Sequence, residues 1–68
     1  MKIYRYLTGP DNDKFCHRVT EALNNGYELY GAPTLTYDTA KGTTICGQAI
    51  VKDVPEKTYE PDMDFRGL

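Results

Sequence analysis

Two cysteines and one histidine are the residues of this sequence whose types allow nucleophilic chemistry. Cys16 and His17 are adjacent, and Cys46 lies in the second half of the chain. A cysteine–histidine dyad needs the thiolate and the imidazole within hydrogen-bond reach. Neighbouring helix residues do not face each other, so we expect Cys16 to turn toward the apolar side and His17 toward solvent. The spacing favours an inert pair, with His17 and Glu21 forming an exposed i, i+4 pair.

Cys46 falls in a predicted strand, on the face that it shares with Thr44 and Gln48. We expect this face to lie away from the helix. A reactive thiol needs a nearby cation or helix N-terminus that lowers its pKa. Lys52 or Arg5 would supply that charge only if strand pairing brought one of them near. The alternative is a small buried thiol at an interface between subunits, because free cysteine often packs as a hydrophobic residue.

Tyrosine is the most unusual feature of the composition, with six residues against two phenylalanines and no tryptophan. Its ring supplies apolar area and its hydroxyl a polar end, which suits half-buried surfaces and interfaces. We expect Tyr27, directly after a predicted helix end, to pack in the core. Tyr4, Tyr6 and Tyr30 are candidates for an interface or for a wall on which a ligand stacks.

Several common site motifs are missing from the sequence. The glycines at 9 and 42 do not match the spacing of a phosphate-binding loop. The acidic residues between 60 and 64 lack the glycine and the closing glutamate of a calcium loop. One histidine and two cysteines are too few for a closed zinc site. The sequence therefore predicts no metal and no cofactor.

Length and charge limit the classes of partner. The chain has 68 residues and a net charge of −2, from 8 basic and 10 acidic side chains. This balance gives no general attraction to nucleic acids or anionic membranes, and we expect neither as a partner. No apolar run approaches the roughly 18 residues of a membrane span, and the first residues do not form a signal peptide, so we expect a soluble cytoplasmic protein. Because so short a chain builds only a marginal core, we also expect it to form a homo-oligomer.

The elements that must position these side chains follow from local patterns. Alternating apolar and polar residues, bounded by glycine and proline, predict strands over 2–7, 27–38 and 43–54, the second of them interrupted at 31–33. A helix over 11–25 is predicted by an apolar stripe of Phe15, Val19, Ala22 and Leu23. The fold class is α+β in the order β-α-β-β, with one helix packed on a small three-stranded, mainly antiparallel sheet and an irregular C-terminal tail. We divide the chain into a domain over 1–54 and an extended acidic tail over 55–68.

The last strand and the tail indicate which face of the sheet is covered and by what. One face of strand 43–54 is small and apolar, and we expect the helix to lie on it: Ile45, Gly47, Ala49 and Val51. The opposite face, with Cys46 and Ile50, would then need a cover. In the tail, Tyr59, Met63 and Phe65 are apolar enough to lie across that face as an arm; the alternative is a disordered tail.

Three segments resemble a known family. They read K-I-Y-R-Y-L-T-G-P over 2–10, F-C-H-R-V-T-E-A-L-N-N-G-Y-E-L-Y-G over 15–31 and I-C-G-Q-A-I-V over 45–51. Together they resemble a family of short bacterial proteins catalogued as domain of unknown function 1737. The resemblance covers residues 2–53. It implies one compact domain and no particular activity.

We expect a non-enzymatic homo-oligomeric protein, most simply a two-fold dimer, that binds through a tyrosine-rich sheet face or subunit interface. Its partner would be a protein or a small polar ligand of nucleotide type, which the chain would sequester. A nucleotide suits such a surface because aromatic rings stack on bases and guanidinium groups bind phosphate. The alternatives are a cysteine-dependent enzyme that uses Cys46 or the Cys16–His17 pair, and a structural assembly protein. The predicted binding residues are Tyr4, Arg5, Tyr6, Tyr30, Thr44, Cys46 and Gln48.

Overall fold

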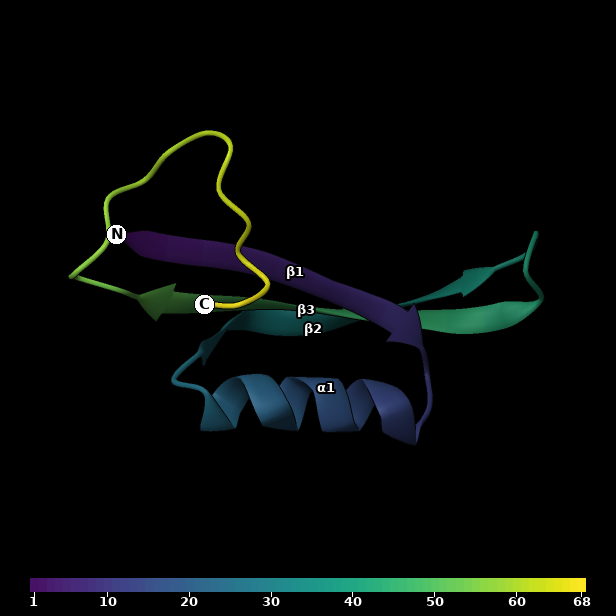
Figure 1. The fold of residues 1–68 in the computed structure, drawn as a ribbon. Coiled ribbons are helices and arrows are strands. Elements are labelled where there is room, and N and C mark those ends of the chain that lie inside the picture. Colours follow the sequence, from purple (N-terminus) through teal and green to yellow (C-terminus); the bar gives the residue numbers. More distant parts are fainter.

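One helix and one three-stranded sheet make up the computed structural model, which describes residues 1–68 (Figure 1). The elements are β1 (Lys2–Pro10), α1 (Asp13–Asn24), β2 (Glu28–Asp38) and β3 (Thr43–Asp53). The strand order in the sheet is β1-β3-β2, and both pairs are antiparallel. The last strand of the sequence therefore lies in the centre. The predicted α+β class and β-α-β-β order are confirmed.

Local chemistry sets both ends of α1. The side chain of Asn12 accepts hydrogen bonds from the backbone N–H groups of Lys14 and Phe15, at 3.0 and 3.3 Å, and so caps the first turn. Asp13 places a negative charge at the positive end of the helix dipole. The chain leaves the helix through Gly26, whose φ of 92° is readily adopted only by glycine. With 12 residues, α1 is too short and too polar to cross a membrane.

β2 is interrupted at residues 31–33, as the sequence predicted. Its register against β3 shifts between Tyr30 and Thr34. Within the interruption, Gly31 has a φ of 73°, and Pro33 has no N–H group to donate to a sheet ladder. Because β2 is an edge strand, the proline and the bulge hinder another chain from pairing along this edge.

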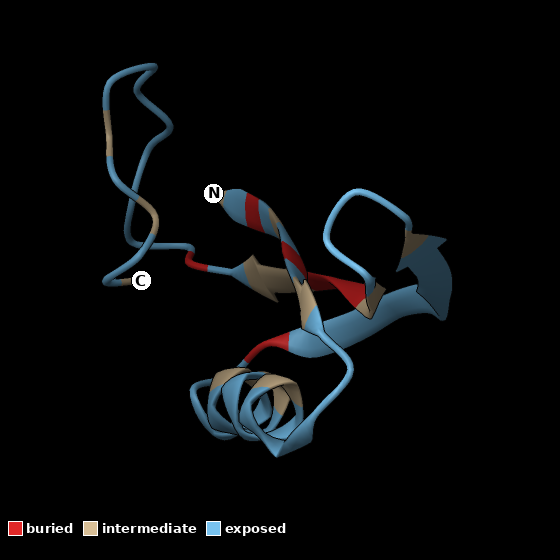
Figure 2. Cartoon of the chain, turned by 90° about the vertical axis from the view of Figure 1, so that its right-hand side faces the viewer, coloured by how far each residue is buried: buried red, intermediate tan, exposed pale blue.

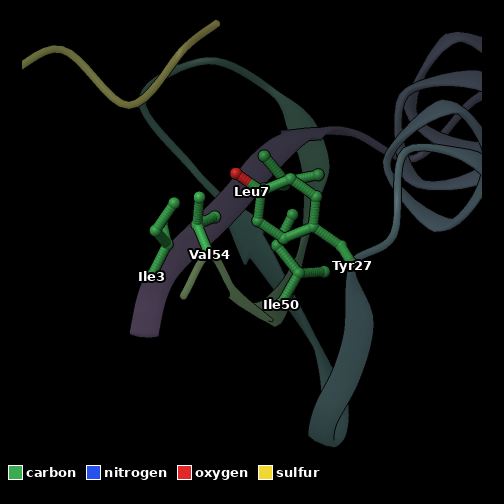
Figure 3. Packing of buried hydrophobic residues seen from close by; sticks show 5 residues of the cluster. All are labelled: Ile3, Leu7, Tyr27, Ile50 and Val54. Atoms are coloured by element: carbon green, nitrogen blue, oxygen red, sulfur yellow. The ribbon is translucent and has the colours of Figure 1, made fainter. Parts of the chain in front are cut away.

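The core is a cluster of five buried apolar residues on one side of the sheet (Figure 3). Its members are Ile3, Leu7, Tyr27, Ile50 and Val54. Phe15, Val19 and Ala22 of α1 pack against it, as the helical stripe predicted. Leu23, at the margin of that stripe, is 42% exposed instead. Figure 2 shows the buried residues concentrated in β3 and at points of β1, with most of α1 and β2 exposed.

α1 covers the opposite face of β3 from the one predicted. Paired residues of neighbouring strands point to the same side of the sheet. The register pairs Ile50 with Arg5, and Arg5 lies on the same side of β1 as Ile3 and Leu7 because every second residue of a strand shares a face. The helix packs against this large apolar set and not against the small face of β3. The physical reason is area: isoleucine and leucine bury far more apolar surface under a helix than glycine and alanine do.

The tail after β3 contains no helix or strand. It loops out beside the N-terminal end of β1 and returns to the sheet (Figures 1 and 2). Phe65 and Leu68 pack against the core cluster, on the same side as α1, whereas Tyr59 is 58% exposed. The expectation that an arm covers the Ile50 face is confirmed for Phe65, but α1 covers that same face, and Tyr59 does not pack there. The core extends past α1 under Phe65 and Leu68, and this is the apolar surface that the returning tail covers.

Candidate functional site

The sheet face turned away from α1 carries three of the predicted site residues. Tyr4 and Tyr6 of β1 and Tyr30 of β2 are 55%, 47% and 62% exposed. Between them runs β3, whose Ala49 pairs with Tyr6 on one side and with Tyr30 on the other. We name this surface the tyrosine face. Its members are Tyr4, Tyr6, Tyr30, Thr34, Ile45, Gly47, Ala49 and Val51.

A hydrogen bond closes over the middle of the tyrosine face. The hydroxyl oxygens of Tyr6 and Thr34 are 2.6 Å apart, and β3 runs between the two strands that carry them. Gly47 lies beneath this bond, where a Cβ atom would be 2.5 Å from the Tyr6 hydroxyl oxygen and 2.8 Å from Thr34 Oγ1. Contacts that short do not occur at real Cβ atoms, so the bond requires glycine at this position. It holds the Tyr6 ring against β3.

The other four predicted site residues lie on the face that α1 covers. They are Arg5, Thr44, Cys46 and Gln48. The structure therefore does not bring the predicted set together, and the placement of Cys46 on the face away from the helix is wrong. The error has one cause, because reversing the two faces of a strand moves every second side chain to the other side of the sheet.

Gln48 has a structural role in the interruption of β2. Its side chain is buried, with 4% exposure, and its Nε2 donates to the carbonyl oxygens of Gly31 at 3.2 Å and Ala49 at 2.9 Å. The bulge removes Gly31 from the regular ladder, so its carbonyl lacks a ladder donor, and the buried carbonyl of Ala49 also needs one. The amide supplies it, so Gln48 is occupied within the fold.

Cys46 is a buried thiol whose nearest polar partners are backbone groups. Its Sγ donates to the carbonyl oxygen of Gly9 at 3.4 Å. Burial raises the pKa of the Cys46 thiol, and the negative charge of Asp11 raises it further. A nucleophilic thiol needs the opposite shift. Cys16 is exposed on α1, so the expectation that it turns toward the apolar side is wrong. No group of three or more His, Cys, Asp or Glu side chains comes together to hold a metal ion.

A cavity of about 440 Å³ opens between α1, the sheet and the returning tail. Its lining contains all three arginines of the chain, together with Lys52. Of these arginines, only Arg5 was among the predicted binding residues. A signal for Arg18 existed, because it follows Phe15 by three residues and so lies beside the apolar stripe of the helix. No local pattern indicated that Arg66 returns to the sheet.

Comparison with known families gives one match. The model of the family described as "Domain of unknown function (DUF1737)" matches residues 1–53. The match agrees with the resemblance that the three sequence segments indicate. It spans the chain from the first residue to the end of β3, so it includes the whole tyrosine face but not Arg66. No match was found among curated proteins or among solved structures.

Proposed function

The chain belongs to the DUF1737 family, and we propose from its own surfaces that it is a non-enzymatic binding protein whose tyrosine face docks a second copy of the chain. The observation that carries this proposal is the exposure of three tyrosine side chains on a sheet face that neither α1 nor the tail covers. Contiguous exposed apolar surface on a small domain is typical of an interaction site. Tyrosine suits such a site, because its ring is apolar and its hydroxyl stays hydrated until a partner arrives.

The tyrosine face is ordered without a partner. The Tyr6 hydroxyl is fixed to Thr34, and Ala49 beneath the rings is only 7% exposed. Association becomes less costly when interface side chains lose little freedom on binding. The fixed ring of Tyr6 thus supports a surface built for contact.

The arrangement around β3 favours a second copy as the partner. Tyr6 and Tyr30 flank Ala49 from opposite sides, so a two-fold axis along β3 would set Tyr6 of one copy against Tyr30 of the other. The tyrosine face itself contains no charged residue, and the charged residues on the same side of the sheet lie beyond its two ends: Lys2, Glu28, Asp38 and Asp53. Like charges therefore do not meet over its centre. The core is also small, with 9 of 68 residues buried, so the apolar contact between copies would add stability.

We place the protein in the cytoplasm. Both of its cysteines are free, Cys16 exposed on the helix and Cys46 buried under it. Exposed thiols persist in reducing compartments, whereas small secreted domains use their cysteines in disulfides.

Light scattering coupled to size-exclusion chromatography, over a series of protein concentrations, tests the proposal. We expect a dimer that dissociates on dilution. Tyr30→Glu should shift it to the monomer, because a carboxylate would be buried between the copies. Tyr37→Glu is the matched control: Tyr37 lies on the same strand, is also 62% exposed and points to the other face. A wild-type monomer at every concentration, or equal effects of the two variants, would refute the proposal.

A further inference from the structure

We propose that the cavity between α1, the sheet and the tail binds a small ligand through a phosphate group. The site lies on the opposite side of the sheet from the tyrosine face, so it goes beyond the proposed function and does not depend on it. Its volume of about 440 Å³ is in the range of small-molecule sites.

Four separate segments bring positive charge to this cavity. The basic residues of the lining are Arg5 from β1, Arg18 from α1, Lys52 from β3 and Arg66 from the tail. The lining contains one acidic residue, Glu21, although the chain as a whole has more acidic than basic side chains. Composition alone therefore does not account for the cluster. The positive charge of the cluster attracts a negatively charged ligand.

Two of these cations, Arg5 and Arg18, have no carboxylate partner. Arg18 Nη1 donates to the backbone carbonyl of Thr8 at 2.7 Å, a contact that positions the side chain without cancelling its charge. Lys52 Nζ donates to the main-chain oxygen of Leu68, the last residue of the sequence, which carries a carboxylate. The guanidinium of Arg66 is paired with Asp64 at 3.0 Å.

Asp64 indicates what the cluster can hold. The Arg66 guanidinium holds the pKa of the Asp64 carboxyl below its ordinary value, and the charge of Arg5 acts in the same direction. Asp64 is thus an anionic group of the chain itself that already lies within the field of two of the arginines. A bound phosphate would compete with it.

Tyr27 is the second, independent observation. Its side chain lines the cavity and is 5% exposed, yet its hydroxyl oxygen is buried without any hydrogen-bond partner. Figure 3 shows the ring packed with Leu7 and Ile50 and the hydroxyl pointing away from α1. A buried hydroxyl without a partner is unfavourable and rare in native proteins. Less than 1 Å² of this oxygen is accessible, so a ligand oxygen gives the donor an acceptor only when the side chains that cover it move aside.

The geometry favours phosphate over carboxylate. A carboxylate is planar and is met well by one guanidinium, whereas a phosphate presents oxygens in several directions. Cations that converge from four segments match the second pattern. Lys52, whose Nζ lies 5.3 Å from the centre of the Tyr27 ring, adds a point charge over that ring.

Isothermal titration calorimetry with pyrophosphate, at about 20 mM salt so that screening is weak, tests the proposal. We expect saturable binding that Arg5→Gln weakens by about fivefold or more. Lys41→Gln is the control, since it removes the same charge from the exposed turn between β2 and β3 and should leave the affinity unchanged. Asp64→Asn should strengthen binding, because it removes the competing carboxylate. No saturable heat, or an equal loss in Lys41→Gln, would overturn the proposal.

Tyr27→Phe separates a ligand contact from a structural role. The substitution removes only the unpaired hydroxyl, so the free protein should melt at the same temperature or higher, while pyrophosphate affinity falls. Unchanged affinity in this variant would contradict the assignment of Tyr27. A parallel titration with adenosine monophosphate and adenosine distinguishes the source of the phosphate. Binding of the nucleotide but not of the nucleoside supports an organic phosphate, binding of pyrophosphate alone supports an inorganic one, and equal binding of nucleotide and nucleoside refutes phosphate recognition.

Discussion

Gly47→Ala should destabilise the protein, although alanine normally suits a strand better than glycine. The new Cβ would lie 2.5 Å from the Tyr6 hydroxyl oxygen and 2.8 Å from Thr34 Oγ1. Because the obstructing atoms are the ends of two exposed side chains that can swing aside, the overpacking cost is at the low end of its range, about 1 kcal/mol. Loss of the Tyr6–Thr34 hydrogen bond adds about 0.5–1.5 kcal/mol. The stiffer unfolded chain gives back about 0.4–1 kcal/mol. The net loss is about 1 kcal/mol, which in a domain of this size lowers Tm by roughly 4–8 °C.

Thermal unfolding followed by circular dichroism measures this effect. Gly67→Ala is the control, because no atom lies within 4 Å of a Cβ built there, and it should melt like the wild type. In a Tyr6→Ala/Thr34→Ala background, both obstructing side chains are gone, and Gly47→Ala should no longer lower Tm. A Gly47→Ala protein that melts with the wild type, or a loss that persists in that background, would refute the described packing of the tyrosine face.

Three further predictions concern the other side of the sheet. In a Cys16→Ser protein, the remaining Cys46 should react with a disulfide reagent only above the pH expected for a free thiol, since burial raises its pKa above 9.0. Because the folded pKa is the raised one, the stability that the neutral thiol contributes is complete below pH 9.0 and is lost as the pH rises further; ordinary reactivity would contradict the burial. Gln48→Leu should lower the free energy of unfolding in urea by about 1–3 kcal/mol, because buried carbonyl groups lose their donor, and an unchanged midpoint would argue against that role. Removal of residues 58–68 should lower Tm, because the core loses the cover of Phe65 and its neighbours, and an unchanged Tm would mean that the tail does not pack there.

Local signals were sufficient to predict the elements of this fold. The apolar stripe of α1 is a property of a short segment, and it was visible in the sequence. The interruption of β2 around Pro33 was visible for the same reason, because proline cannot donate to a ladder whatever its neighbours are. These predictions needed no knowledge of which strands pair.

The faces of the sheet could not be predicted from one strand at a time. β3 carries apolar residues on both sides, so its own pattern does not tell which side the helix covers. The answer depends on register: Ile50 pairs with Arg5 and so joins the side of Ile3 and Leu7. The cationic cavity could not be predicted either. Arg66 reaches it through the path of the tail, which no sequence periodicity indicates.

Isotope-filtered nuclear Overhauser spectroscopy on a mixture of labelled and unlabelled protein tests the central claim most directly. The signals it selects arise only between protons of different copies. We predict signals between the ring protons of Tyr6 in one copy and those of Tyr30 in the other. Contacts between copies that involve only Leu35 or Tyr37, which are exposed on the other face, would contradict docking through the tyrosine face, as would a mixture without any signal between copies.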